Sequence, residues 1–243
     1  MSDLGVIQVR HLFKRFGPKV VLRDIGFEVQ AGEFVALLGP NGAGKTTFLR
    51  ILASLSRPTL GEVMIGGYRL PHQAAAVRRR LGVVSHLPLL YGDLTAEENL
   101  RFYGRMYAVE RLEARVSEVL DLVGLASRRR DLVRTFSRGM QQRLAIGRAV
   151  LHDPELLLLD EPHTGLDQDA CEMLDHVLRQ VAVRGRTLVM TSHDLARASE
   201  LASRFDILSR GQIRATTRAD ALPQDGLLAF YRQALAEGGP RDG

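Results

Sequence analysis

The segment from Gly39 to Thr46 reads Gly-Pro-Asn-Gly-Ala-Gly-Lys-Thr, which is the spacing GxxxxGK[ST] of a phosphate-binding loop. Glycines let the backbone wrap a phosphate with its N–H groups, and the helix that follows adds partial positive charge. The lysine of such a loop reaches the β- and γ-phosphates, and the hydroxyl ligates Mg²⁺. The residues predicted to contact the nucleotide are Gly39, Pro40, Asn41, Gly42, Ala43, Gly44, Lys45, Thr46 and Thr47.

Two adjacent carboxylates, Asp160 and Glu161, follow the apolar run 156–159. At the carboxyl end of a buried strand, the first could hold hydrated Mg²⁺ and the second could deprotonate the water that attacks the γ-phosphate. Asp-Glu before Pro162 is also good turn chemistry. The apolar residues before the pair and the upstream phosphate loop favour the catalytic interpretation.

A second potential phosphate site lies at 136–143, which reads Phe-Ser-Arg-Gly-Met-Gln-Gln-Arg. Ser137 is a good N-cap residue, and Gly139 allows close approach to the backbone of the first helical turn. One protomer rarely needs two such sites for one nucleotide.

The elements that would position these residues are those of an α/β protein. Short apolar runs at 33–38, 81–85, 156–160, 187–191 and 205–209 predict buried strands, separated by helices, in a mainly parallel sheet. The first 30 residues and 205–214 predict antiparallel edge strands. The pattern at 88–148 predicts a helical insert between two parts of the α/β core. Within it, Thr95 and Glu98 form a capping box, and Gly124 ends a helix that starts near Leu112.

Composition agrees with a globular chain of 243 residues, 45% of them hydrophobic. The single cysteine, Cys171, predicts a packed side chain and no disulfide. No apolar run is long enough to cross a bilayer, and no apolar targeting segment opens the chain, so a membrane role would require a partner. A net charge of +5 suggests nucleic acid, but the arginine triplets 78–80 and 128–130 lack interleaved aromatic residues and favour a solvated surface.

Together these motifs resemble the ATP-binding subunit of an ABC transporter, in family order and over nearly the whole chain. The segment 136–140 resembles the LSGGQ signature, and 165–167 resembles the D-loop. The segment 191–194 resembles the switch-histidine segment. Phe16 stands where an aromatic ring stacks on adenine, although taken alone it would suggest core packing. His193, taken alone, would suggest an ordinary surface or core histidine.

The resemblance implies a P-loop NTPase core forming one ABC ATPase domain over 1–243, with a helical subdomain at about 88–148. It implies ATP and Mg²⁺ as cofactors, and two subunits paired head to tail beneath an integral membrane permease, on the cytoplasmic face of the cell membrane. Nucleic acid is not an expected partner. The implied catalytic residues are Glu161 and His193, the metal ligands are Thr46 and Asp160, and the contacts to the opposite subunit's ATP are Ser137, Arg138, Gly139 and Asp167.

Three residues depart from the family pattern. Arg138 replaces the first signature glycine and Met140 replaces the final glutamine. His86 stands where the glutamine loop has Gln, and it is a candidate metal ligand with one ring nitrogen in place of a neutral amide. Histidine here, within 83–103, most resembles the haem-exporter ATPase of cytochrome c maturation.

Two alternatives remain open at this stage. An ABC ATPase acting on nucleic acid or ribosomes would fit the basic charge, but such proteins usually carry two cassettes or a long coiled coil. A soluble phosphoryl-transfer enzyme would need an acceptor pocket and would have no use for the signature helix.

Overall fold

The computed structural model describes residues 6–85 and 87–236, so the predicted ligand His86 lies outside the described residues. The chain divides into two compact units. The phosphate-loop unit comprises Met1–Arg78 and Thr187–Gly243, and the helical unit comprises Arg79–Arg186. Within the described ranges, no helix combines the length and apolarity that crossing a membrane requires.

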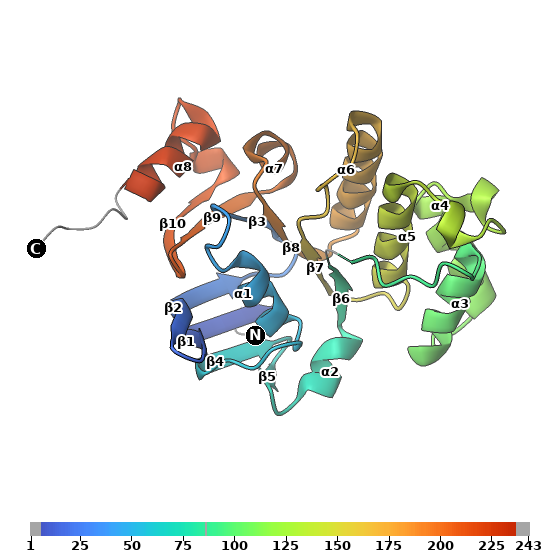
Figure 1. Cartoon of the computed structure of the whole chain (residues 1–243), viewed down its shortest axis with the longest axis horizontal. Helices are drawn as coiled ribbons and strands as arrows, with labels where there is room; N and C mark the ends of the chain where they lie inside the picture. Colours follow the sequence, from blue (N-terminus) through green and yellow to red (C-terminus); the bar gives the residue numbers. More distant parts are fainter. Residues whose placement is uncertain (1–5, 86, 237–243) are drawn as a thin grey trace, which may run out of the picture. The chain divides into compact units, whose positions relative to one another are not determined.

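The first sheet of the phosphate-loop unit is antiparallel, with strand order β2-β1-β4-β5 (Figure 1). In this unit the prediction of antiparallel N-terminal strands is confirmed. The elements of the unit are β1 (Ile7–Phe16), β2 (Lys19–Val29), β3 (Phe34–Leu38), α1 (Lys45–Leu52), β4 (Leu60–Ile65), β5 (Tyr68–Leu70), α2 (Ala74–Arg79, at whose end the helical unit begins), β8 (Thr187–Ser192), α7 (Leu195–Leu201), β9 (Arg204–Ser209), β10 (Gln212–Arg218), a short 3₁₀ turn (Ala219–Ala221) and α8 (Gly226–Ala236).

The second strand set of this unit has β3 parallel to both β8 and β9, with β10 antiparallel to β9. Every residue of β3 and β8 is buried, as expected for strands covered on both faces. By contrast, β10 alternates half-buried and exposed residues, which suits an edge strand. Strand β8 reaches Ser192, one residue beyond the predicted end, and α1, the helix that follows the phosphate loop, runs from Lys45 to Leu52.

In the described residues of the helical unit, strands β6 and β7 pair in parallel, and four α-helices, α3 to α6, lie wholly within the unit. The elements are β6 (Leu81–Val84), α3 (Ala96–Met106), α4 (Leu112–Leu122), 3₁₀ turns at Ala126–Arg128 and Val133–Thr135, α5 (Arg138–Val150), β7 (Leu156–Asp160) and α6 (Gln168–Val183). Strand β7 has the predicted bounds. Helix α5 continues two residues beyond the predicted end of the insert at Arg148.

Local signals in the sequence determine where these helices begin and end. Thr95 and Glu98 form the predicted capping box at the start of α3. Gly124 adopts φ 64° after α4, and the Leu125 N–H donates to the Leu120 carbonyl at 2.8 Å, so the predicted glycine stop is confirmed. Cys171 on α6 is buried and unbridged, as predicted.

Candidate nucleotide-binding site

The phosphate loop occupies the turn between β3 and α1. Its three spaced glycines, Gly39, Gly42 and Gly44, all have positive φ, which L side chains adopt at a cost. A Cβ at Gly39 would lie 2.0 Å from the Leu208 carbonyl oxygen. A Cβ at Gly44 would lie 2.7 Å from Leu22 Cδ2. Both backbone conformation and space therefore require glycine at Gly39 and Gly44, whereas at Gly42 backbone conformation alone favours it.

Lys45 opens α1 and is 7% exposed. Its Nζ donates to the Gly39 carbonyl at 2.7 Å and to the Pro40 carbonyl at 3.4 Å. The ammonium group therefore lies over the loop whose amides would cradle a phosphate. Thr46 follows on the exposed side of the first helical turn.

His193 leaves the sheet at the same edge as the phosphate loop. Strand β8 pairs in parallel with β3, and Leu38 lies opposite Ser192. The next residues, Gly39 and His193, therefore both stand just past the carboxyl ends of neighbouring strands, where open α/β sheets bind ligands. His193 is exposed, and Asp194 caps α7 by accepting from the Arg197 N–H at 3.1 Å.

Phe16 ends β1 and is 53% exposed, so the alternative interpretation of Phe16 as a core residue is wrong. Lys14 Nζ lies 4.6 Å from the centroid of its ring. Phe16 pairs with Lys19, close to the part of β2 that packs against Gly44. An exposed ring on this hairpin is available for stacking on a base.

In the helical unit, Asp160 ends β7 and is 8% exposed, while Glu161 comes next and is half-buried. Glu161 adopts φ 50°, a left-handed conformation that non-glycine residues rarely occupy. The Glu161 carbonyl accepts from the Thr164 N–H at 3.2 Å, which begins the turn leading to Asp167. Asp167 caps α6 by accepting from the Ala170 N–H at 2.8 Å.

The predicted signature residues open helix α5. The Ser137 hydroxyl accepts from the Met140 N–H at 3.2 Å, so the predicted N-cap is confirmed. A Cβ at Gly139 would lie 2.6 Å from Ala170 Cβ on α6, so close helix packing requires this glycine. Ser137 and Arg138 are exposed.

Sequence reasoning missed two contacts at the turn after Glu161. A Cβ at Gly165 would lie 2.7 Å from Arg138 Cζ, so the guanidinium lies directly over this glycine. His163 forms a buried hydrogen bond with Asp175 of α6. Neither contact could be predicted from the spacing of residues in the sequence, because each joins residues that only folding brings together. Glu161 and Arg138 also line one cavity of about 340 Å³.

The candidate residues are thus divided between the units. The phosphate-loop unit holds Phe16, the loop and His193. The helical unit holds Asp160, Glu161, the signature residues and Asp167.

Comparison with known proteins agrees with this arrangement. A family model described as ABC transporter matches residues 22–164. A linearmycin resistance ATP-binding protein of Bacillus subtilis (strain 168) is 37% identical over 86% of this chain and 68% of its own length. A Nod factor export ATP-binding protein of Cupriavidus metallidurans is 38% identical over 86% of this chain and 69% of its own.

Two solved structures share the fold. The ATP-binding subunit of an ABC transporter superposes with a TM-score of 0.85 and 32% identity, covering 95% of this chain and 99% of that one. A dimeric ATP-binding cassette in a post-hydrolysis state, bound to ADP and Pi, gives a TM-score of 0.78 and 28% identity, covering 88% and 98%.

The fold and the motifs define an α/β ATPase with a phosphate-binding loop. The chain belongs to the ABC transporter family, as an ATP-binding subunit that hydrolyses ATP. The finer resemblance to a haem-exporter ATPase receives no support from these relatives, whose names refer to linearmycin resistance and Nod factor export.

Proposed function

We propose that this chain drives export of a substrate through a membrane permease, by ATP-dependent pairing of two ATPase subunits. The observation that carries the proposal is that two helices of one chain begin at N-termini suited to binding phosphate. One is the phosphate loop before α1, and the other is the Ser137-capped start of α5. In a head-to-tail pair, the second would meet the nucleotide of the opposite subunit through Ser137, Arg138, Gly139 and Asp167.

ATP and Mg²⁺ fit the donors that the chain offers. Mg²⁺ prefers oxygen ligands and is usually bound through one or two carboxylates together with substrate phosphates. The Thr46 hydroxyl and the Asp160 carboxylate would hold it, and the ion would neutralise charge on the phosphates. Lys45 and the loop amides would bind the β- and γ-phosphates, and Phe16 would stack on adenine.

Glu161 would accept the proton of the water that attacks the γ-phosphate, and His193 would contact that phosphate. His86 stays a proposed ligand at the glutamine-loop position. We propose the whole chain as one cassette, with residues 88–148 as its helical subdomain.

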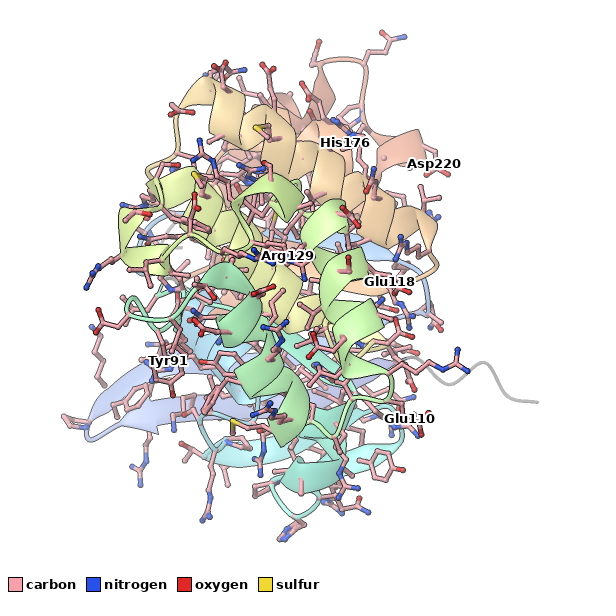
Figure 2. The ribbon with its side chains drawn as sticks, turned by 90° about the vertical axis from the view of Figure 1, so that its right-hand side faces the viewer. Tyr91, Glu110, Glu118, Arg129, His176 and Asp220 are labelled. Carbon is pink, nitrogen blue, oxygen red and sulfur yellow. The ribbon has the colours of Figure 1, made fainter. Side chains whose placement is uncertain are left out.

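An exposed apolar patch in the helical unit supports docking to a permease. We call it the aromatic patch. By this name we mean the exposed apolar side chains of the loop at 87–91 and of helix α3, which are Leu87, Leu89, Tyr91, Phe102 and Met106 (Tyr91 is labelled in Figure 2). The rings of Tyr91 and Phe102 meet edge to face at 5.0 Å.

The loop of this patch is fixed from inside by Asn99. Its side-chain oxygen accepts from the Tyr91 N–H and its amide donates to the Tyr91 carbonyl, both at 2.9 Å. A rigid, exposed apolar surface is typical of a protein interface. We propose that a permease binds here and keeps this chain at the inner face of the cell membrane.

Export is the direction we propose, because the Nod factor relatives are named for export. The same names give no support to haem as cargo. The identity of the cargo would follow from the permease recovered with this chain.

Replacing Glu161 with Gln tests the proposed chemistry. The variant should bind ATP as the wild type does and lose hydrolysis by at least about 100-fold, because an amide cannot accept the proton. Glu155→Gln is the matched control. In the described contacts, the Glu155 carboxylate pairs with Arg80 at the surface. Steady-state phosphate release measures both, and an active Glu161→Gln would refute the assigned base.

A further inference from the structure

A buried histidine and a buried aspartate join the turn after Glu161 to helix α6. His163 Nε2 lies 2.6 Å from Asp175 Oδ1, and the two side chains are 9% and 4% exposed. Because a carboxylate has no hydrogen to give, Nε2 carries the hydrogen and donates it. The other ring nitrogen, Nδ1, is buried and meets no hydrogen-bond partner in the described part of the chain. The bond to Asp175 therefore sets the orientation of the ring.

His163 lies in the middle of a turn that holds itself together by backbone bonds. The Glu161 carbonyl accepts from the Thr164 N–H, and the His163 carbonyl accepts from the Leu166 N–H, both at 3.2 Å. The end of the turn is attached to α6 because Asp167 caps that helix. The His163–Asp175 bond adds a second attachment to the same helix, much closer to Glu161.

Glu161 needs such an attachment because of its backbone. Its φ of 50° is in the left-handed region, which a residue with a side chain keeps only when its surroundings hold it there. A general base must also be held within hydrogen-bond reach of its water, and small displacements reduce the rate strongly. Loosening the turn should therefore reduce catalysis more than nucleotide affinity, because the proposed contacts to adenine and to the β- and γ-phosphates, Phe16 and the phosphate loop, lie in the other unit.

We propose that His163 is a positioning residue for ATP hydrolysis, holding Glu161 in its catalytic geometry through the bond to Asp175. The inference rests on the proposed role of Glu161 as general base. Replacing both partners of a buried hydrogen bond with apolar groups of the same shape can be nearly neutral for stability. The principal effect of this pair is therefore on the position of the Glu161 carboxylate.

The direct test is His163→Leu, which keeps the volume and removes the donor. At temperatures well below unfolding, kcat should fall about tenfold while KM for ATP stays unchanged. His163→Gln should restore most of the rate, because its amide can donate at the position of Nε2. His176→Leu is the matched control, since His176 is an exposed histidine of α6, next to Asp175 in sequence (labelled in Figure 2), and its replacement should leave kcat unchanged.

A double variant separates positioning from stability. If His163 acts through Glu161, then adding His163→Leu to Glu161→Gln should not lower the residual single-turnover rate any further. A further tenfold loss in that background would overturn the proposal. So would a His163→Gln variant no more active than His163→Leu. Should His163→Leu fail to fold, Asp175→Leu, which removes the acceptor of the same hydrogen bond, carries the test, and an unchanged kcat in that variant overturns the proposal.

Failure of this inference is distinguishable from failure of the proposed function. A fully active Glu161→Gln variant would refute the assigned base. A folded and fully active His163→Leu variant, alongside an inactive Glu161→Gln, would refute the positioning role alone.

Discussion

Lys45 is one of three lysines among 33 basic residues, and it is the lysine that opens the helix after the phosphate loop. Lys45→Ala should lose ATP binding by roughly 100-fold, because truncating one side of a buried charge pair costs about 2–5 kcal/mol. Lys19→Ala, at an exposed position, should leave affinity unchanged. Titration calorimetry with ATP measures both. Unchanged affinity in the Lys45 variant would contradict the phosphate-loop assignment.

His152 gives the helical unit a pH-dependent stability. Its ring stacks on Tyr107 at 3.9 Å between centroids, and burial lowers the pKa of its imidazole to about 4, from 6.5. The neutral folded form is fully favoured above pH 6.5. Below it the unfolded chain takes up a proton that the folded chain resists, so stability is lost between pH 6.5 and about 4.

His152→Phe should remove this dependence while keeping a ring against Tyr107. As the pH falls from 7 to 4.5, the wild type should lose this stability and the variant should not. The free energy of unfolding of the variant should therefore gain at most about 3 kcal/mol over that of the wild type. Urea denaturation of the two proteins at several pH values measures the difference. Parallel pH profiles would show that His152 does not carry the effect.

At the scale of elements, the sequence predicts whatever depends on near neighbours. The four leucines before Asp160 predict β7, and the glycine at 124 predicts the end of α4, because period and backbone freedom are local properties. The predicted loop motif also falls between a strand and a helix, as its chemistry needs. The contacts of His163 with Asp175 and of Arg138 with Gly165 have no such pattern, because they depend on how α5 and α6 pack.

The packing of α5 on α6 gives a prediction at this scale. Gly139→Ala should cost about 1–3 kcal/mol, because its Cβ would lie 2.6 Å from Ala170 Cβ. Ala170→Gly alone should cost about 1 kcal/mol of helix propensity. The double variant removes the clash, so its loss should be smaller than the sum of the two. Chemical denaturation of the four proteins gives the coupling energy, and additive losses would show that the two positions do not touch.

At the scale of the whole molecule, the chain divides into two compact units, and each holds some of the residues proposed for nucleotide chemistry. The phosphate-loop unit presents the loop and His193, and the helical unit presents Asp160, Glu161 and the capped start of α5. A related cassette of the same fold is dimeric with ADP and Pi bound. If the start of α5 meets the partner's nucleotide, then its charge should decide whether two chains pair.

Substitutions at Ser137 test that pairing without disturbing the helix cap, since Asp and Asn cap as well as Ser. In a Glu161→Gln background with ATP, where hydrolysis should not release the pair, the chain should run as a dimer in light scattering coupled to gel filtration. Adding Ser137→Asn should preserve that dimer. Adding Ser137→Asp should return the chain to a monomer, because the carboxylate would face phosphate. Lys45→Ala in the same background should also give a monomer at ATP concentrations that saturate the parent, since roughly 100-fold weaker binding would leave most chains without ATP. An ATP-dependent dimer that tolerates Ser137→Asp would place the phosphate contact elsewhere than at the start of α5.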